Sequence, residues 1–271
     1  MIGGGGIKLH VREWGNPTGV PLLFVHGWSQ CHLSWLRQCE SDLAERFRIV
    51  AFDLRGHGMS DAPLDQEQYS DGEKWADDIA AIIEQLALLK PILVGWSYGG
   101  AVVSDYVKKY GDRKIGGINF VAAAVKLGKA SAALIGPGFL DNVPAARAED
   151  LAANISAMRN FLRACFGKQI GSEDFETALA YNMVVQPKIR GFLLKRELDF
   201  APVLESIAVP VLVTHDRSDS VVLPAMSDTI MDHCGTAIVS WYDGTAHAPF
   251  FLEAARFNGE LARFALDASR T

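Results

Sequence analysis

Residues 94–100 have the sequence Val-Gly-Trp-Ser-Tyr-Gly-Gly and lie between an apolar, strand-like run at 91–94 and a helix-like segment at 101–110. Glycines two residues before and two residues after a serine, at a strand-to-helix turn, are what a nucleophile elbow requires. In so tight a turn, a side chain at Gly95 or Gly99 would collide with neighbouring backbone. The serine itself is held in a strained geometry that lifts its hydroxyl clear of the sheet. The pattern predicts Ser97 as a nucleophile.

A serine hydroxyl becomes reactive when a base accepts its proton and a third group orients that base. For this type of elbow, the expected chain order is serine, acid, histidine. Three histidines follow Ser97 in the chain. His215 ends a strand-like run and is expected to be structural, and His233 lies in a polar helix and is expected at the surface. His247 lies in a loop beyond a strand, where open α/β sheets place their chemistry, and is the predicted base. The alternative for His247 is a solvated loop residue.

Two carboxylates in the loop after the strand-like run 209–214 are candidates for the acid. Asp219 lies deeper in the loop and is favoured, because the acid must be a buried carboxylate that holds the second imidazole nitrogen. Asp216 lies at the strand end and could instead brace the loop. Asp105 and Asp112 follow the elbow too closely to serve.

Attack on an ester carbonyl creates an oxyanion, which backbone amides can stabilise. The amide of Tyr98, directly after the nucleophile, is the first predicted donor. The second is expected in the loop after an earlier strand, and residues 22–29, Leu-Leu-Phe-Val-His-Gly-Trp-Ser, fit this description. Gly27 would allow a close backbone approach, and Trp28 would present its amide. His26 is interpreted as a hydrogen-bonded brace of this loop rather than as a catalyst.

The chain resembles the serine hydrolases of the α/β-hydrolase superfamily over nearly its whole length, in the branch of esterases, lactonases and perhydrolases. The resemblance rests on these elements, which stand in the family's order: His26-Gly27-Trp28, Asp53-Leu54-Arg55-Gly56-His57-Gly58-Met59-Ser60, the elbow, Asp219 and Gly244-Thr245-Ala246-His247. In that family, the His-Gly-x loop supplies an oxyanion amide, and Arg55 and His57 belong to a structural loop. The family's acid motif often has glycine where this chain has Asp216, so the choice between Asp216 and Asp219 stays open. Serine at the nucleophile position favours acyl chemistry over the alkyl chemistry of aspartate-dependent relatives.

Alternation of strand-like and helix-like segments predicts a mostly parallel sheet with helices on both faces. Together with the resemblance, this implies the α/β-hydrolase fold with a sheet of the eight-stranded type. The expected strands are 7–14, 22–25, 47–52, 92–94, 115–122, 209–214 and 237–241. The expected helices include 33–45, 75–89, 101–110, 225–234 and 250–266.

Residues 126–197 interrupt the alternation with a helical pattern. We expect them to form an inserted lid, or cap, of three or four helices over Ser97, with residues 1–125 and 198–271 forming the hydrolase core. Such lids shape a pocket and exclude water. Any single apolar lid residue is more simply explained by packing against the core. As a group they predict a mostly apolar pocket with these wall residues: Trp28, Tyr98, Phe139, Phe161 and Met183.

Composition excludes several other classes of protein. A formal net charge of −6 and a pI near 5.6, without a basic cluster, argue against nucleic acid as a partner. No apolar run approaches the roughly 20 residues that cross a bilayer. The scattered cysteines, Cys31, Cys39, Cys165 and Cys234, indicate reduced thiols in a cytoplasmic protein. No zinc-binding spacing is present, and no cofactor is expected.

These observations predict a hydrolase of carboxylic esters or lactones with a small-molecule substrate, acting through an acyl-enzyme on Ser97. A perhydrolase, in which peroxide replaces water, would use the same residues. A non-enzymatic small-molecule receptor on the same fold is the alternative from another class of protein. Turnover of many ester equivalents would exclude the receptor.

Overall fold

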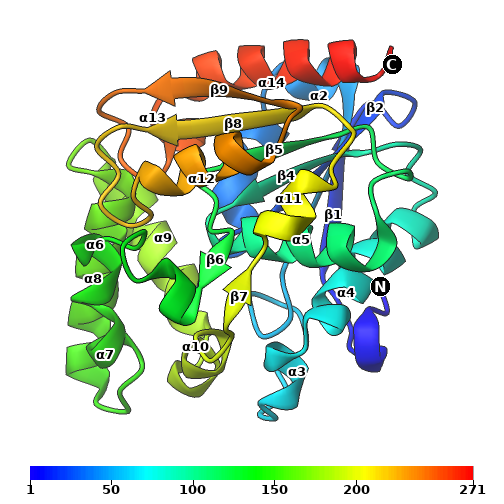
Figure 1. The fold of residues 1–271 in the computed structure, drawn as a ribbon. Helices are drawn as coiled ribbons and strands as arrows, with labels where there is room; N and C mark the ends of the chain where they lie inside the picture. The colour runs from blue at the N-terminus through cyan, green and yellow to red at the C-terminus, as the bar shows by residue number, and fades with distance from the viewer. Residues whose placement is uncertain (271) are drawn as a thin grey trace.

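The main sheet has seven strands in the order β1-β3-β2-β4-β5-β8-β9, in a computed structural model that describes residues 1–270 (Figure 1). The strands are β1 (Val11–Gly15), β2 (Val20–Val25), β3 (Phe47–Phe52), β4 (Ile92–Trp96), β5 (Gly117–Val121), β8 (Val211–Asp216) and β9 (Ala237–Tyr242). β1 pairs antiparallel with β3, and every other neighbouring pair is parallel. The predicted α/β class with a mostly parallel sheet is confirmed.

The sheet has seven strands where the resemblance implied the eight-stranded type, and the difference lies near the N-terminus. Of the strand expected at 7–14, only the residues from Val11 onward join the sheet, as β1. The residues before Val11 make one isolated antiparallel bridge, between Ile2 and Lys8. The glycine run between them forms a 3-10 turn, η1 (Gly4–Gly6), in which Gly5 and Gly6 have positive φ. Glycine adopts that conformation without steric cost, so the run forms a turn rather than extending a strand.

Helices cover both faces of the sheet (Figure 1). One layer contains η2 (His32–Trp35), α1 (Leu36–Cys39), α2 (Leu43–Arg46), α13 (Pro249–Leu252) and α14 (Ala254–Ala268). The other contains α3 (Glu67–Ser70), α4 (Gly72–Gln85), α5 (Tyr98–Tyr110), α11 (Ala201–Glu205) and α12 (Ala225–His233). The strands β2, β4 and β5 are buried along almost their whole length, as expected for parallel strands covered on both faces.

The helix expected at 33–45 is broken into three short pieces. Ser41 lies between α1 and α2, where its hydroxyl donates to the carbonyl of Gln38 at 2.8 Å and accepts from the amide of Leu43 at 3.2 Å. A serine side chain that bonds to nearby backbone in this way competes with the helical ladder.

Between β5 and β8, the chain leaves the sheet and forms a helical segment, residues 126–199. It contains η3 (Gly128–Ser131), α6 (Pro137–Leu140), α7 (Val143–Ala146), α8 (Leu151–Phe166), α9 (Ser172–Val184) and α10 (Pro187–Leu193). A two-stranded ribbon of β6 (Lys126–Leu127) and β7 (Leu198–Asp199) joins the two ends of the segment. Figure 1 shows α6, α8 and α9 beyond the carboxyl ends of β8 and β9. The segment has five α-helices where three or four were expected, because two of them are single turns that begin near a proline.

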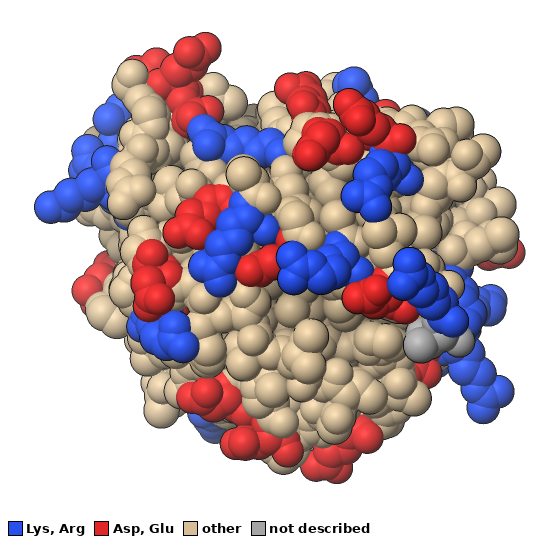
Figure 2. Space-filling view, turned by 90° about the horizontal axis from the view of Figure 1, so that it is seen from above, with Lys and Arg blue, Asp and Glu red and all other residues tan. Residues whose placement is uncertain are grey.

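Charges of both signs are interspersed on the face that carries α14 (Figure 2). Arg256, for example, pairs with Glu260 at 2.9 Å. The cysteines of the described chain are free and buried. Within residues 1–270, none of the helices combines the length and the apolar character that crossing a bilayer demands.

Candidate active site

Ser97 lies at the turn between β4 and α5 with φ 54° and ψ −120°, a conformation that is costly for a residue with a side chain. A Cβ at Gly95 would lie 2.9 Å from the carbonyl oxygen of Gly99, and a Cβ at Gly99 would overlap the carbonyl oxygen of Val25. The amide of Ser97 donates to Val121 on β5 at 3.0 Å. The two glycines and this hydrogen bond hold the strained serine in the elbow geometry.

Asp219 and His247 form a buried hydrogen-bonded pair. Nδ1 of His247 lies 2.6 Å from Oδ2 of Asp219, and the two residues are 0% and 2% exposed. The carbonyl of His247 accepts a hydrogen bond from the indole of Trp96 at 2.8 Å. Since Trp96 directly precedes Ser97, this bond ties the histidine loop to the elbow.

His215 contacts the same carboxylate oxygen. Its Nε2 lies 2.9 Å from Oδ2 of Asp219 and 3.0 Å from the carbonyl of Val222. The carboxylate oxygen and the carbonyl oxygen can only accept hydrogen bonds, so Nε2 of His215 must carry the proton. The other ring nitrogen, Nδ1, lies 2.7 Å from the hydroxyl of Ser227. Burial alone would raise the pKa of Asp219, but the charge of His247 and the hydrogen bonds from His215 and His247 outweigh burial and hold this pKa well below its usual value.

Asp216, the other candidate acid, faces a different set of donors. One of its oxygens accepts from the amide and hydroxyl of Ser218, and the other accepts from the amide and hydroxyl of Thr245. These bonds join the loop after β8 to the loop after β9. The carboxylate that contacts His247 is that of Asp219.

The other ring nitrogen of His247, Nε2, is buried and has no hydrogen-bond partner within residues 1–270. The hydroxyl of Ser97 also makes no hydrogen bond to the described part of the chain, so the link between the serine and the histidine is not formed. Buried polar atoms without a partner are rare in folded proteins. Hydrogen bonds between catalytic groups are often long without substrate and tighten when it binds.

The loop at 26–29 runs beside the serine. A Cβ at Gly27 would lie 3.0 Å from Cβ of Ser97, so glycine permits this close approach. Tyr98 is the first residue of α5, and its amide therefore has no acceptor inside the helix. Within the described residues, the amide of Trp28 also donates to no other group.

Two neutral histidines brace this loop. His26 donates from Nδ1 to Gly27 at 2.8 Å and accepts the amide of Leu54 at Nε2. His57 donates from Nδ1 to Arg55 at 2.9 Å and accepts the amide of Ser29 at Nε2. Burial lowers the pKa of His26 from 6.5 to about 4 and that of His57 from 6.5 to about 3. A proton on Nε2 of either histidine would face the backbone N–H that this nitrogen now accepts, so two donors would meet.

A guanidinium from α10 holds the same loop from the other side. Arg190 is fully buried and donates from Nε to the hydroxyl of Ser29 at 2.9 Å. The two terminal nitrogens of the guanidinium donate to neutral oxygens of Ala146, Asn154 and Asn182. The backbone carbonyl of Arg190 accepts the indole N–H of Trp28 at 3.3 Å. Burial lowers the pKa of Arg190 to about 10.

The two bracing histidines predict an acid-sensitive fold. Below pH 6.5 the unfolded chain takes up a proton at each histidine, whereas the native chain does not until the pH approaches about 4 or about 3. The free energy of unfolding should therefore fall as the pH drops below 6.5, by up to about 1.4 kcal/mol per pH unit for each histidine. Urea unfolding near pH 7.5 and near pH 5 measures the change. His57→Asn should reduce this pH dependence, whereas His233→Asn, a change at a half-exposed residue paired with Glu205 at 2.8 Å, should not. Equal pH dependence in all three proteins would contradict the assignment.

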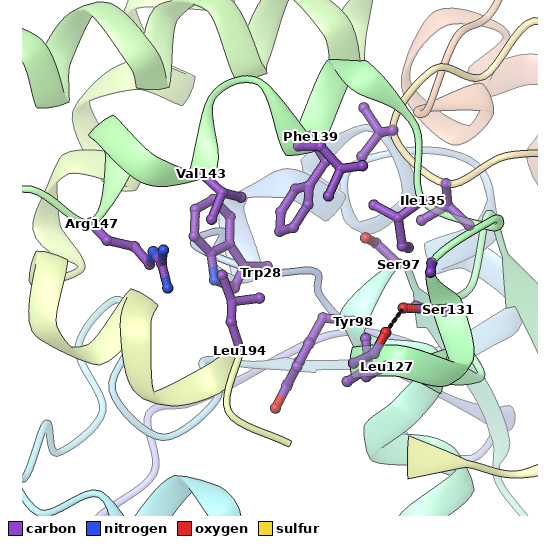
Figure 3. A pocket seen from close by; sticks show the side chains of 16 residues that line it. Trp28, Ser97, Tyr98, Leu127, Ser131, Ile135, Phe139, Val143, Arg147 and Leu194 are labelled. Atoms are coloured by element: carbon purple, nitrogen blue, oxygen red, sulfur yellow. Dashed lines mark hydrogen bonds between the residues drawn. The ribbon is translucent and has the colours of Figure 1, made fainter. Parts of the chain in front are cut away.

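A cavity of about 430 Å³ opens at the elbow (Figure 3). Ser97 lines it, together with three of the residues predicted as walls: Trp28, Tyr98 and Phe139. Phe161 lies outside the lining and packs edge-on against Trp28, with ring centroids 5.3 Å apart. Met183 also lies outside the lining, with its sulfur 4.0 Å from the guanidinium of Arg190.

Sequence reasoning missed several of the lining residues. The larger apolar ones are Leu127, Ile135, Leu140, Val143, Leu194, Val221 and Val222. The cavity also has one charged residue, Arg147, which follows α7. A composition of mostly apolar walls with few polar groups is typical of small-molecule sites. No local pattern marks Arg147, because a turn between two helices is a usual place for a solvated arginine.

Comparison with known proteins places this fold in a family. Residues 22–260 match the family model described as Alpha/beta hydrolase family. The chain is 32% identical to a putative aryl esterase from Burkholderia cenocepacia, with a TM-score of 0.95 over 100% of this chain and 98% of that one. It is 32% identical to the esterase RhEst1 from Rhodococcus sp. ECU1013, with a TM-score of 0.93 over 97% and 96%. A segment covering 39% of this chain is 39% identical to the bifunctional esterase/perhydrolase DCH from Acinetobacter calcoaceticus, of which it covers 37%. The chain belongs to the alpha/beta hydrolase family.

Proposed function

We propose that this protein is a serine hydrolase of carboxylic esters or lactones that acts through an acyl-enzyme. Ser97 is the nucleophile, His247 the base and Asp219 the acid that orients the base. The amides of Trp28 and Tyr98 are the oxyanion donors. The helical segment at 126–199 serves as a lid over the cavity. One observation carries the proposal: the hydrogen-bonded pair of Asp219 and His247 leaves a buried imidazole nitrogen without a partner within residues 1–270. The indole of Trp96 joins this histidine to the strained serine elbow.

In the first half-reaction, Nε2 of His247 accepts the hydroxyl proton of Ser97 while Oγ attacks the carbonyl carbon of the substrate. The carbonyl oxygen becomes an oxyanion between the two amides. Asp219 remains ionised and stabilises the imidazolium that forms, because its low pKa keeps the proton on the histidine. His247 then protonates the leaving alcohol, and an acyl group remains on Ser97.

In the second half-reaction, water attacks the acyl-enzyme with the same histidine as base, and the acid is released. The two solved relatives with 32% identity are called esterases, which supports ester hydrolysis over other reactions of the fold. The relative called a bifunctional esterase/perhydrolase favours a second reaction, in which peroxide attacks the same acyl-enzyme and releases a peracid.

Covalent labelling tests the nucleophile directly. A fluorophosphonate mimics the tetrahedral intermediate and reacts only with an activated serine. We expect one phosphonyl group per chain, located by peptide mass spectrometry on Ser97, and a proportional loss of p-nitrophenyl butyrate hydrolysis. Heat-denatured protein is the matched control and should stay unlabelled. Labelling at another serine, or full activity after complete labelling, would contradict the proposal.

A further inference from the structure

One end of the cavity carries a positive charge that the mechanism does not use. Arg147 is the one charged side chain that lines it, and Figure 3 shows this arginine and Ser97 on opposite sides of Trp28. Val143 and Leu194 lie beside Trp28 in this view, between Arg147 and Ser97. A substrate that fills the cavity would therefore place its carbonyl at Ser97, an apolar portion along the middle and its far end near the guanidinium.

The positive charge continues outside the cavity. Arg147 also lines a neighbouring surface hollow between α7 and α10, together with Lys188 and Lys195. Neither lining contains an aspartate or a glutamate. Three exposed cations thus gather at the Arg147 end of the cavity and in the hollow beside it, in a chain whose formal net charge is −6.

No acidic side chain of the described residues neutralises these cations, although Lys188 and Lys195 each lie over the ring of Phe192, at 5.7 and 5.8 Å from its centroid. Within residues 1–270, none of the three forms an ion pair, and the side chain of Arg147 makes no hydrogen bond. Lys195 donates to the neutral amide oxygen of Gln66 at 2.6 Å. By contrast, Arg196, one residue further on, is buried and paired with Asp105 at 2.7 Å. The guanidinium at the cavity end is free to bind an anion, and its planar fork suits a carboxylate.

We infer that the preferred substrates are esters that carry an anionic group, such as a carboxylate, at the end remote from the scissile carbonyl. This inference rests on the proposed function and specifies its substrate class. Arg147 binds the anion, and Lys188 and Lys195 raise the local concentration of anionic substrate beside the cavity. The anion lies either on the acyl part or on the alcohol part of the ester.

Two matched pairs of substrates separate these cases. Monomethyl adipate carries a carboxylate on its acyl part and is compared with neutral methyl hexanoate. The anion ω-acetoxyhexanoate carries a carboxylate on its alcohol part and is compared with neutral hexyl acetate. We expect Arg147→Gln to lower kcat/KM for the anionic member of at least one pair by about tenfold, mainly through KM, because an exposed charge contact is screened by water. The neutral members should change by less than about twofold. Arg147→Glu should lower kcat/KM for the anionic member further, because it adds repulsion.

Ionic strength provides an independent readout. In the wild type, kcat/KM for the anionic ester should fall as salt rises, and this dependence should weaken in Arg147→Gln. Arg159→Gln is the matched control, since it removes the same charge from an exposed position on α8 outside both hollows. It should leave every rate unchanged.

Failure of the inference is distinguishable from failure of the proposed function. If Arg147→Gln changed the anionic and neutral esters equally, or changed neither, the anion site would be refuted while the hydrolase assignment stood. If the wild type hydrolysed none of the four esters and no p-nitrophenyl ester, the proposed function would fail, and the inference with it.

Discussion

Ser97→Ala is expected to lower kcat for p-nitrophenyl butyrate by about 10⁴- to 10⁶-fold, the range for loss of a serine nucleophile. Alanine retains the Cβ, so the strain at φ 54° is unchanged. The hydroxyl makes no hydrogen bond within the described chain, and the free energy of unfolding should therefore change by less than about 0.5 kcal/mol. Steady-state rates and urea unfolding of the same preparations measure both effects.

Ser104→Ala is the matched control for this substitution. Ser104 is also buried on α5, but its hydroxyl donates to the carbonyl of Gly100 at 2.9 Å and does not line the cavity. Its loss should cost at most about 1 kcal/mol of stability and leave kcat nearly unchanged. Wild-type turnover in Ser97→Ala would remove the nucleophile from the mechanism.

Asp219→Asn should lower kcat by about 10⁴-fold, as expected when an amide replaces the carboxylate that orients the base. The contacts explain the size of the effect. One oxygen of Asp219 faces His247 and His215, and the other faces the amides of Val221 and Val222. An asparagine has only one oxygen acceptor, so in either orientation its NH₂ group meets donors.

Asp216→Asn tests the competing assignment in the same assay. Its partners are Ser218 and Thr245, so the substitution should cost about 1–3 kcal/mol of stability while kcat falls by about tenfold or less. A larger loss of kcat in Asp216→Asn than in Asp219→Asn would reverse the choice of acid.

Much of the fold could be predicted because its signals are local. Residues 49–52 form a continuous apolar run, and β3 contains them together with Phe47 and Arg48. The elbow depends on two glycines whose backbone neighbours permit no side chain. The helix at 33–45 could not be predicted correctly, because the break between α1 and α2 depends on the direction in which one hydroxyl, that of Ser41, forms its hydrogen bonds.

The cavity was harder to predict than the elbow, because periodicity shows that a helix has an apolar face but not which layer that face contacts. Phe161 and Phe139 are both aromatic residues of the inserted segment. Phe139 lines the cavity, whereas Phe161 packs behind Trp28. Arg147 reaches the cavity only through the placement of α7 against α10, which no nearby residue signals. The contact between His215 and Asp219 likewise depends on how the loop after β8 folds back.

Arg190 limits how the active site can admit a substrate. The hydrogen-bond acceptors of its guanidinium are neutral: oxygens of the loop at 26–29 and of the helical segment itself, and the sulfur of Met183. If α10 swung away from the core, this cation would lose Ser29, and the indole of Trp28 would lose its acceptor. We therefore expect α10 to remain docked during turnover, so that ligands enter without a swing of this helix and the amides proposed as oxyanion donors keep their positions.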